Sequence, residues 1–107
     1  YILSLHVVLP FVQTHWFYVL YGREDNNLDK WTCSHVETRF LVHTSGGVKS
    51  TKHRRPLILL FTRKFDSKSE ALAYERYVKT IEGGIHLKNV LINMGLLTSL
   101  GKLSSDG

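Results

Sequence analysis

Residues Thr44–Glu75 have the sequence TSGGVKSTKHRRPLILLFTRKFDSKSEALAYE, and this stretch decides the fold. The continuous apolar run Leu57–Phe61 follows a proline and is typical of a central β-strand. Ser67–Glu70 (SKSE) is a capping box, in which the serine and glutamate side chains satisfy free N–H groups at a helix start. We therefore expect a strand followed by a helix that runs to about Ile81 and ends at Gly83–Gly84.

Two more strands are expected on the N-terminal side of this stretch. His15–Tyr21 (HWFYVLY) is dense in aromatic and β-branched residues and predicts a buried strand. The weaker alternation of Leu28–Thr32 predicts a second strand. The polar turn Gly22–Asn27 joins the two and predicts an antiparallel hairpin. After the hairpin, a second capping box at Ser34–Glu37 predicts a helix that runs to about residue 43.

Together these elements predict an α+β fold, with a three-stranded antiparallel sheet flanked by helices in the order β-β-α-β-α-α. The last helix is expected within Ile85–Leu100. We expect an apolar N-terminal tail at 1–14, one domain at 15–82, and a C-terminal helical extension and tail at 83–107. Tyr1–Val12 is apolar but shorter than the roughly 20 residues that cross a bilayer, so neither a signal peptide nor a membrane partner is expected.

The composition favours an anionic partner. The 107 residues carry a formal charge of +5, and residues 38–65 hold half of the basic residues but no Asp or Glu. The segment Val48–Arg55 (VKSTKHRR), expected to be a loop, suits successive phosphates of a nucleic acid. A solvated charged loop is the alternative. The single cysteine, Cys33, excludes an internal disulfide and favours a reducing, cytoplasmic setting.

Four polar side chains fall where apolar ones are expected. Glu75 projects near the middle of the apolar face of its helix, where an unpaired carboxylate is costly. Arg39 and His43 lie one turn apart beside the buried face of the first helix, and guanidinium groups match phosphate oxygens. Tyr18 lies in the first strand, where aromatic residues usually belong to the core. Glu75 at the rim or paired with an arginine, Arg39 extended into solvent and His43 bound to a carbonyl group are the alternatives.

The order and spacing of these residues resemble the GIY-YIG nuclease superfamily, and in particular its small stand-alone bacterial branch. The resemblance covers Trp16–Lys79. It rests on Trp16-Phe17-Tyr18, Glu37-Thr38-Arg39 with His43, Ser45-Gly46, Lys52 to Pro56, and Ser69 to Leu72 leading to Glu75.

This resemblance implies a metal-dependent endonuclease that acts on DNA. Tyr18, Arg39 and His43 correspond to catalytic residues of the family. Glu75 corresponds to the catalytic residue that binds the metal, one Mg²⁺ or Mn²⁺ ion. The segment assigned to nucleic-acid binding contributes five side chains: Lys49, Lys52, His53, Arg54 and Arg55.

The YIG motif departs from the family pattern. Asp29 stands at the tyrosine position, and Trp31 stands where glycine allows close backbone approach. Asp29 could act as a substitute base or second metal ligand, and Trp31 could block the site. Two alternatives therefore stand beside the endonuclease. One is a catalytically inactive nucleic-acid-binding domain, and the other is an interaction module that uses Tyr1–Pro10 and Ile85–Leu100.

Overall fold

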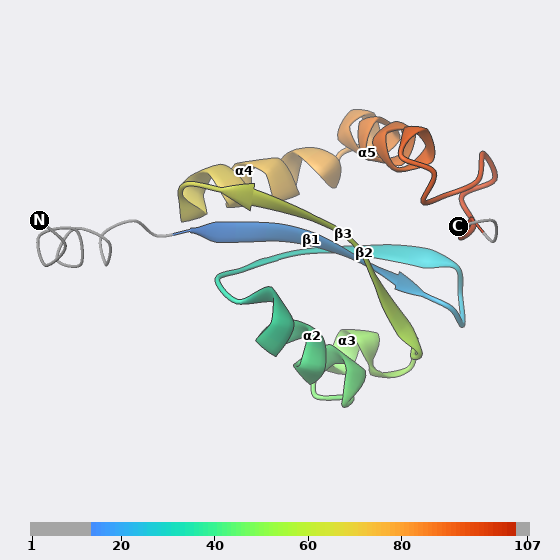
Figure 1. The fold of residues 1–107 in the computed structure, drawn as a ribbon, viewed down its shortest axis with the longest axis horizontal. Coiled ribbons are helices and arrows are strands. Elements are labelled where there is room, and N and C mark those ends of the chain that lie inside the picture. The colour runs from blue at the N-terminus through green and yellow to red at the C-terminus, as the bar shows by residue number, and fades with distance from the viewer. Residues whose placement is uncertain (1–13, 105–107) are drawn as a thin grey trace, which may run out of the picture.

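The computed structural model describes residues 14–104, so most of the tail predicted at 1–14, and residues 105–107, lie outside the described residues. The sheet contains three antiparallel strands in the order β2-β1-β3, flanked by helices as predicted (Figure 1). The elements in chain order are β1 (His15–Gly22), β2 (Asn27–Cys33), α2 (Val36–Thr44), α3 (Lys49–Lys52), β3 (Leu57–Phe65), α4 (Lys68–Val78) and α5 (Ile81–Asn93).

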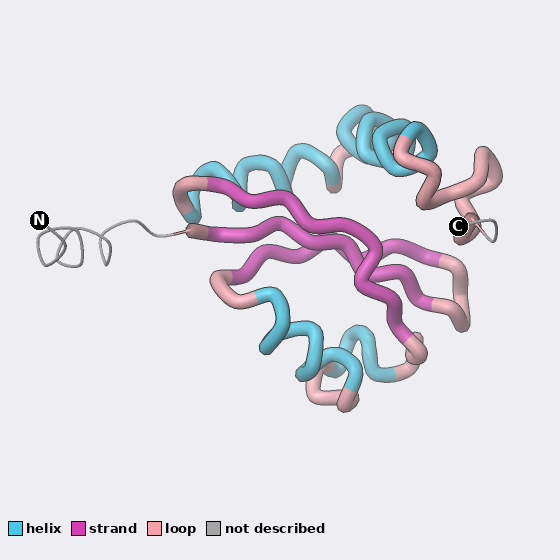
Figure 2. The backbone as a smooth tube through the Cα atoms, viewed as in Figure 1, coloured by secondary structure: helices cyan, strands magenta, loops and turns pink. Residues whose placement is uncertain are grey.

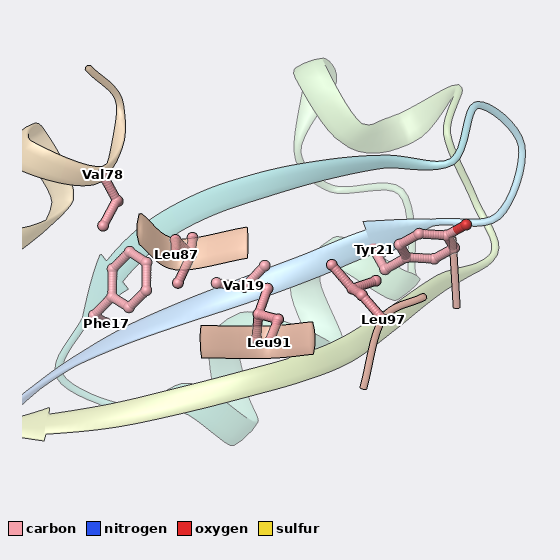
Figure 3. Close-up of a cluster of buried hydrophobic side chains, with 7 residues drawn as sticks. All are labelled: Phe17, Val19, Tyr21, Val78, Leu87, Leu91 and Leu97. Carbon is pink, nitrogen blue, oxygen red and sulfur yellow. The ribbon is translucent and has the colours of Figure 1, made fainter. Parts of the chain in front are cut away.

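Helices cover both faces of this sheet, with α4 and α5 on one side and α2 and α3 on the other (Figure 2). The central strand, β1, is therefore buried on both faces, as its aromatic and β-branched composition predicts. Phe17, Val19 and Tyr21 pack with buried side chains of α4, α5 and the segment after α5 (Figure 3). Tyr18 and Leu20 point to the opposite face, toward α2.

The prediction that Leu57–Phe61 is a central strand is wrong. These residues begin β3, which is longer than predicted and lies at an edge of the sheet. Only Leu57 in this strand is fully buried. Apolar residues on both faces of β3 are half-covered by helices, so a continuous apolar run arises here without a second neighbouring strand.

Of the two predicted capping boxes, the serine half of the one at Ser67 is confirmed, whereas the Glu70 carboxylate bonds to the Ser67 hydroxyl rather than to a free N–H group. The Ser67 hydroxyl accepts a hydrogen bond from the Glu70 N–H at 3.2 Å and donates to the Glu70 carboxylate at 3.1 Å. The box at Ser34 is wrong, because His35 is the N-cap of α2 and no side chain caps this helix. The Ser34 hydroxyl is instead bonded to His35 Nδ1 at 3.0 Å.

The glycine pair at 83–84 does not end α4, which contradicts the prediction. The helix ends at Val78, and Thr80 caps α5 by accepting a hydrogen bond from the Gly83 N–H at 3.0 Å. A Cβ atom at Gly83 would clash with the Tyr77 carbonyl oxygen, so glycine allows the two helices to approach closely. A tertiary contact, rather than helix termination, explains this glycine.

The last helix, α5, also differs from its predicted bounds of Ile85–Leu100. It begins at Ile81 and ends at Asn93, and Gly95 then adopts a left-handed conformation with φ 78°, as expected just after a helix end. Leu87 and Leu91 of α5 belong to the core. The helix therefore crosses the proposed division at residue 82, and that division stays a prediction. Within residues 14–104, no helix is long and apolar enough to cross a bilayer.

Candidate functional site

Tyr18 of β1, His43 of α2 and Thr51 of α3 form a buried chain of hydrogen bonds. The Tyr18 hydroxyl lies 3.0 Å from His43 Nε2, and His43 Nδ1 lies 3.0 Å from Thr51 Oγ1. All three residues have no exposed surface. The expectation that a carbonyl group might satisfy His43 is therefore wrong, because two hydroxyl groups do so.

The hydrogen-bond partners of His43 favour one tautomer, which is assigned from the donors and acceptors around the ring. The Thr51 hydroxyl donates to the Val48 carbonyl oxygen at 3.3 Å, so it is free to accept from an N–H at Nδ1. Nε2 then carries no proton and accepts a hydrogen bond from the Tyr18 hydroxyl. The chain thus runs from Tyr18 through His43 to Thr51, with each group donating to the next.

Both titratable groups of this chain are held in their neutral forms. Burial raises the pKa of Tyr18 to about 12, although the Arg39 guanidinium beside it opposes the rise and the Glu75 carboxylate adds to it. Burial lowers the pKa of His43, and the charge of Arg39 lowers it further, while Asp29 acts in the opposite direction. The charges of Arg39 on α2 and Glu75 on α4 therefore act on Tyr18, and the charge of Arg39 also acts on His43.

Glu75 and Arg39 lie at the edge of this buried chain. The Glu75 carboxylate forms an ion pair with Lys79, one turn along α4, with 2.7 Å between Nζ and Oε2. The expected alternative of pairing with an arginine is therefore wrong. Arg39 is half-buried and, within residues 14–104, no carboxylate lies within 4.0 Å of its guanidinium nitrogens. Its charge remains available to an anion.

The residues that replace the YIG motif fill the space beside Tyr18. Trp31 pairs with Tyr18 across β1 and β2, and its ring centroid lies 5.1 Å from that of His43. The Trp31 Nε1 atom is buried and has no hydrogen-bond partner among the described residues. An unsatisfied buried donor costs about 1–3 kcal/mol, so tryptophan is poorly accommodated at this position.

Asp29 is neutralised by Arg54. The Arg54 guanidinium bonds to the carboxylates of Asp29 and Asp25, the latter at 2.6 Å, and to the Asn27 carbonyl oxygen at 2.8 Å. These contacts join the turn between β1 and β2 to the segment before β3. Most of the Arg54 donors are therefore satisfied within the protein, which leaves it less able than its neighbours to bind a phosphate.

The rest of the basic segment is more accessible, although it is not the loop that we expected, because it contains the short helix α3. Lys49, Lys52 and His53 are exposed. Arg55 is also exposed but donates to the carbonyl oxygens of Lys52 at 3.0 Å and Thr44 at 3.3 Å. Thr51, buried in the same segment, was missed by the sequence analysis, because one threonine in a polar run gives no periodic signal.

The donor set suits a weakly held cation. Residues 14–104 contain no group of three or more His, Cys, Asp or Glu side chains that could enclose a metal. Glu75 is the carboxylate whose charge acts on Tyr18, and Lys79 must release it first. Mg²⁺ is commonly bound by one or two carboxylates together with substrate phosphate and water, so Glu75 fits that role.

The fold and this constellation define a small nuclease-type α+β domain. A family model described as the GIY-YIG catalytic domain matches residues 14–83, and the chain belongs to that family. It is 38% identical over 77 residues to UPF0213 protein SH2523 of Staphylococcus haemolyticus, an alignment that covers 71% of this chain and 93% of the relative.

More distant bacterial relatives share the same segment. UPF0213 protein YazA of Bacillus subtilis is 35% identical over 68 residues, which cover 63% of this chain and 68% of YazA. The solution structure of the UPF0213 protein BH0048 from Bacillus halodurans is 31% identical and covers 72% of this chain and 84% of its own, with a TM-score of 0.47. The family model and the match to the Staphylococcus haemolyticus protein confirm the resemblance to small stand-alone bacterial members of the family.

Proposed function

We propose that this protein is a DNA endonuclease of the GIY-YIG type, which hydrolyses phosphodiester bonds slowly with one Mg²⁺ or Mn²⁺ ion bound at Glu75. One observation carries the proposal. The Tyr18 hydroxyl is held 3.0 Å from His43 Nε2, and the charges of Arg39 on α2 and Glu75 on α4 act on the same hydroxyl in opposite directions. Such a combination of a cation, a carboxylate and a hydroxyl suits phosphoryl transfer.

In this mechanism each side chain has a separate task. Arg39 stabilises the charge that develops on the phosphoryl oxygens. His43 holds the Tyr18 hydroxyl through its unprotonated Nε2, so it can take a proton that passes through Tyr18 from the attacking water. Glu75 would hold a divalent cation, which would supply Lewis-acid stabilisation of the phosphate and the leaving oxygen.

The altered YIG motif explains why we expect slow turnover. Asp29 stands at the tyrosine position, but its carboxylate is held in an ion pair with Arg54 and is not free to contact a substrate. Trp31 covers one side of His43. Loss of one member of a cooperating catalytic set commonly lowers the rate by orders of magnitude.

A second candidate is nucleic-acid binding without hydrolysis. The complete burial of Tyr18 and His43 favours it, because a buried hydroxyl cannot reach a scissile phosphate unless Trp31 moves. The exposed side chains in the basic segment are Lys49, Lys52 and His53. They would bind the phosphate backbone of a nucleic acid whether or not the protein hydrolyses it.

Nicking of supercoiled plasmid with Mg²⁺ or Mn²⁺ separates the two candidates. We expect slow, metal-dependent nicking that falls about 100-fold or more in Glu75→Gln, which removes the charge but keeps the shape. Glu82→Gln, at an exposed acid in the first turn of α5, is the matched control and should leave the rate unchanged. Nicking that persists in Glu75→Gln, or no nicking at high protein concentration, would exclude the endonuclease. Plasmid binding without nicking would support the second candidate.

A further inference from the structure

A cavity of about 410 Å³ lies where the end of β2 meets the first turns of α2 and α4. Seven polar or charged side chains line it: His15, Thr32, Ser34, His35, Thr38, Arg39 and Lys68. No Asp or Glu belongs to the lining. Sequence analysis assigned a catalytic or binding role to only one of these residues, Arg39.

Among the carboxylates of residues 14–104, none is a counter-ion for the cations of this cavity. The three ion pairs found within residues 14–104 involve Arg54 and Lys79, and neither Arg39 nor Lys68 takes part. Positive charges lie close together in the cavity. Burial and the nearby charge of Lys68 both lower the pKa of His15. Converging like charges are unfavourable unless an anion compensates them.

Backbone donors add to the same cavity. Helix α2 has nine residues, and its first intrahelical bond runs from the Arg39 N–H to the His35 carbonyl oxygen at 3.1 Å. The N–H groups before it have no intrahelical acceptor, and no side chain caps the helix. The Ser34 hydroxyl, the expected cap, is bonded to His35. Glu37, the acid of this first turn, lines a neighbouring cavity instead.

We propose that this cavity binds a second phosphate of the nucleic-acid strand, next to the phosphate held between Arg39 and Glu75. This inference rests on the proposed function and extends it. Arg39 borders both places, because it lines the cavity and also lies beside the Tyr18 hydroxyl. Lys68 and Glu75 are seven residues apart on α4 and therefore share one face of that helix. A strand following this face meets Lys68 in the cavity and Glu75 at the reacting phosphate.

The first test measures binding of a short labelled DNA strand with and without a 5′-phosphate. We expect Lys68→Ala and His35→Ala to weaken binding about fivefold and to reduce the salt slope by about one phosphate contact. Lys88→Ala, at an exposed lysine of α5, removes the same charge elsewhere and is the control. If Lys68→Ala and His35→Ala behave like Lys88→Ala while the unaltered protein binds DNA, the cavity is not a phosphate site.

The 5′-phosphate identifies the source of the bound group. If it strengthens binding to the unaltered protein but not to Lys68→Ala, the cavity takes a terminal phosphate. If both strands lose affinity equally in Lys68→Ala, the cavity takes an internal backbone phosphate. Either result supports the proposal.

The second test uses inorganic phosphate alone and does not depend on DNA. Amide resonances of residues 34–38 should shift on titration in the unaltered protein and remain fixed in Lys68→Ala. Shifts that spread over exposed lysines on other elements, or that persist in Lys68→Ala, overturn the proposal. Local shifts without any DNA binding would contradict the proposed function but leave the phosphate site intact. DNA binding without local shifts would contradict the phosphate site but leave the proposed function intact.

Discussion

Replacing Thr51 with valine tests the buried hydrogen-bond chain most directly. Valine keeps the shape of threonine but removes the hydroxyl that accepts from His43 Nδ1. The His43 N–H is then buried without a partner, which costs about 1–3 kcal/mol. The Val48 carbonyl oxygen loses little, because it still accepts from the backbone N–H groups of Thr51 and Lys52 at 3.1 and 3.0 Å. A buried methyl group returns about 0.8 kcal/mol.

We therefore expect Thr51→Val to lower the free energy of unfolding by about 1–2 kcal/mol, which corresponds to about 5–15 °C in Tm for a domain of this size. Urea denaturation is the assay, and the midpoint should fall while the m-value stays constant. Thr62→Val is the control, because Thr62 is exposed on β3 and the change should lie within about 0.5 kcal/mol.

A second measurement examines the reason for the effect rather than its size. Nitrogen-15 NMR of the unaltered protein should find His43 neutral, with the proton on Nδ1 and none on Nε2. A proton on Nε2, or a Thr51→Val variant as stable as Thr62→Val, would refute the reasoning from Thr51 to Tyr18.

Three further predictions follow from charges described above. Lys79→Ala frees the Glu75 carboxylate and should tighten Mg²⁺ binding about two- to fivefold, measured by calorimetry; unchanged affinity would mean that Glu75 does not hold the ion. Because the pKa of His43 is lowered on folding, the unfolded chain takes up a proton first as the pH falls, so the free energy of unfolding should be retained above about pH 6.5 and should decrease as the pH falls below it. A free energy that rises as the pH falls would contradict that sign. The combined change Lys49→Ala and Lys52→Ala should reduce the salt slope of DNA binding by about 2 without changing the melting temperature, and an unchanged slope would exclude these lysines from the interface.

Features that depend on a few neighbouring residues were predicted well from the sequence. The Ser67 cap is an example, because its donors and acceptors lie within one helical turn. The buried character of β1 was also predicted, since aromatic and β-branched residues occupy both of its faces. The four-residue helix α3 was not, because it is too short to show a periodic pattern.

Features that depend on distant contacts escaped prediction. Gly83 was expected to end a helix, but its role is set by contact with the carbonyl group of Tyr77. Arg54 was grouped with the exposed cations, yet its partners Asp25 and Asp29 lie 29 and 25 residues away in the chain. The contact between Tyr18 and His43 agrees with the roles implied by the family resemblance, whereas their complete burial follows only from the way α2 packs on the sheet.

The position of Trp31 gives the molecule an internal optical reporter. The chain has two tryptophans, and the indole of Trp31 lies edge-on to the imidazole of His43. A protonated imidazole quenches indole fluorescence on contact, so the emission of a Trp16→Phe variant tracks the charge of His43 alone. Any ligand, metal or substitution that alters the charge or position of the imidazole then changes the wavelength or intensity of the tryptophan emission. The candidate site can therefore be followed in solution without a label.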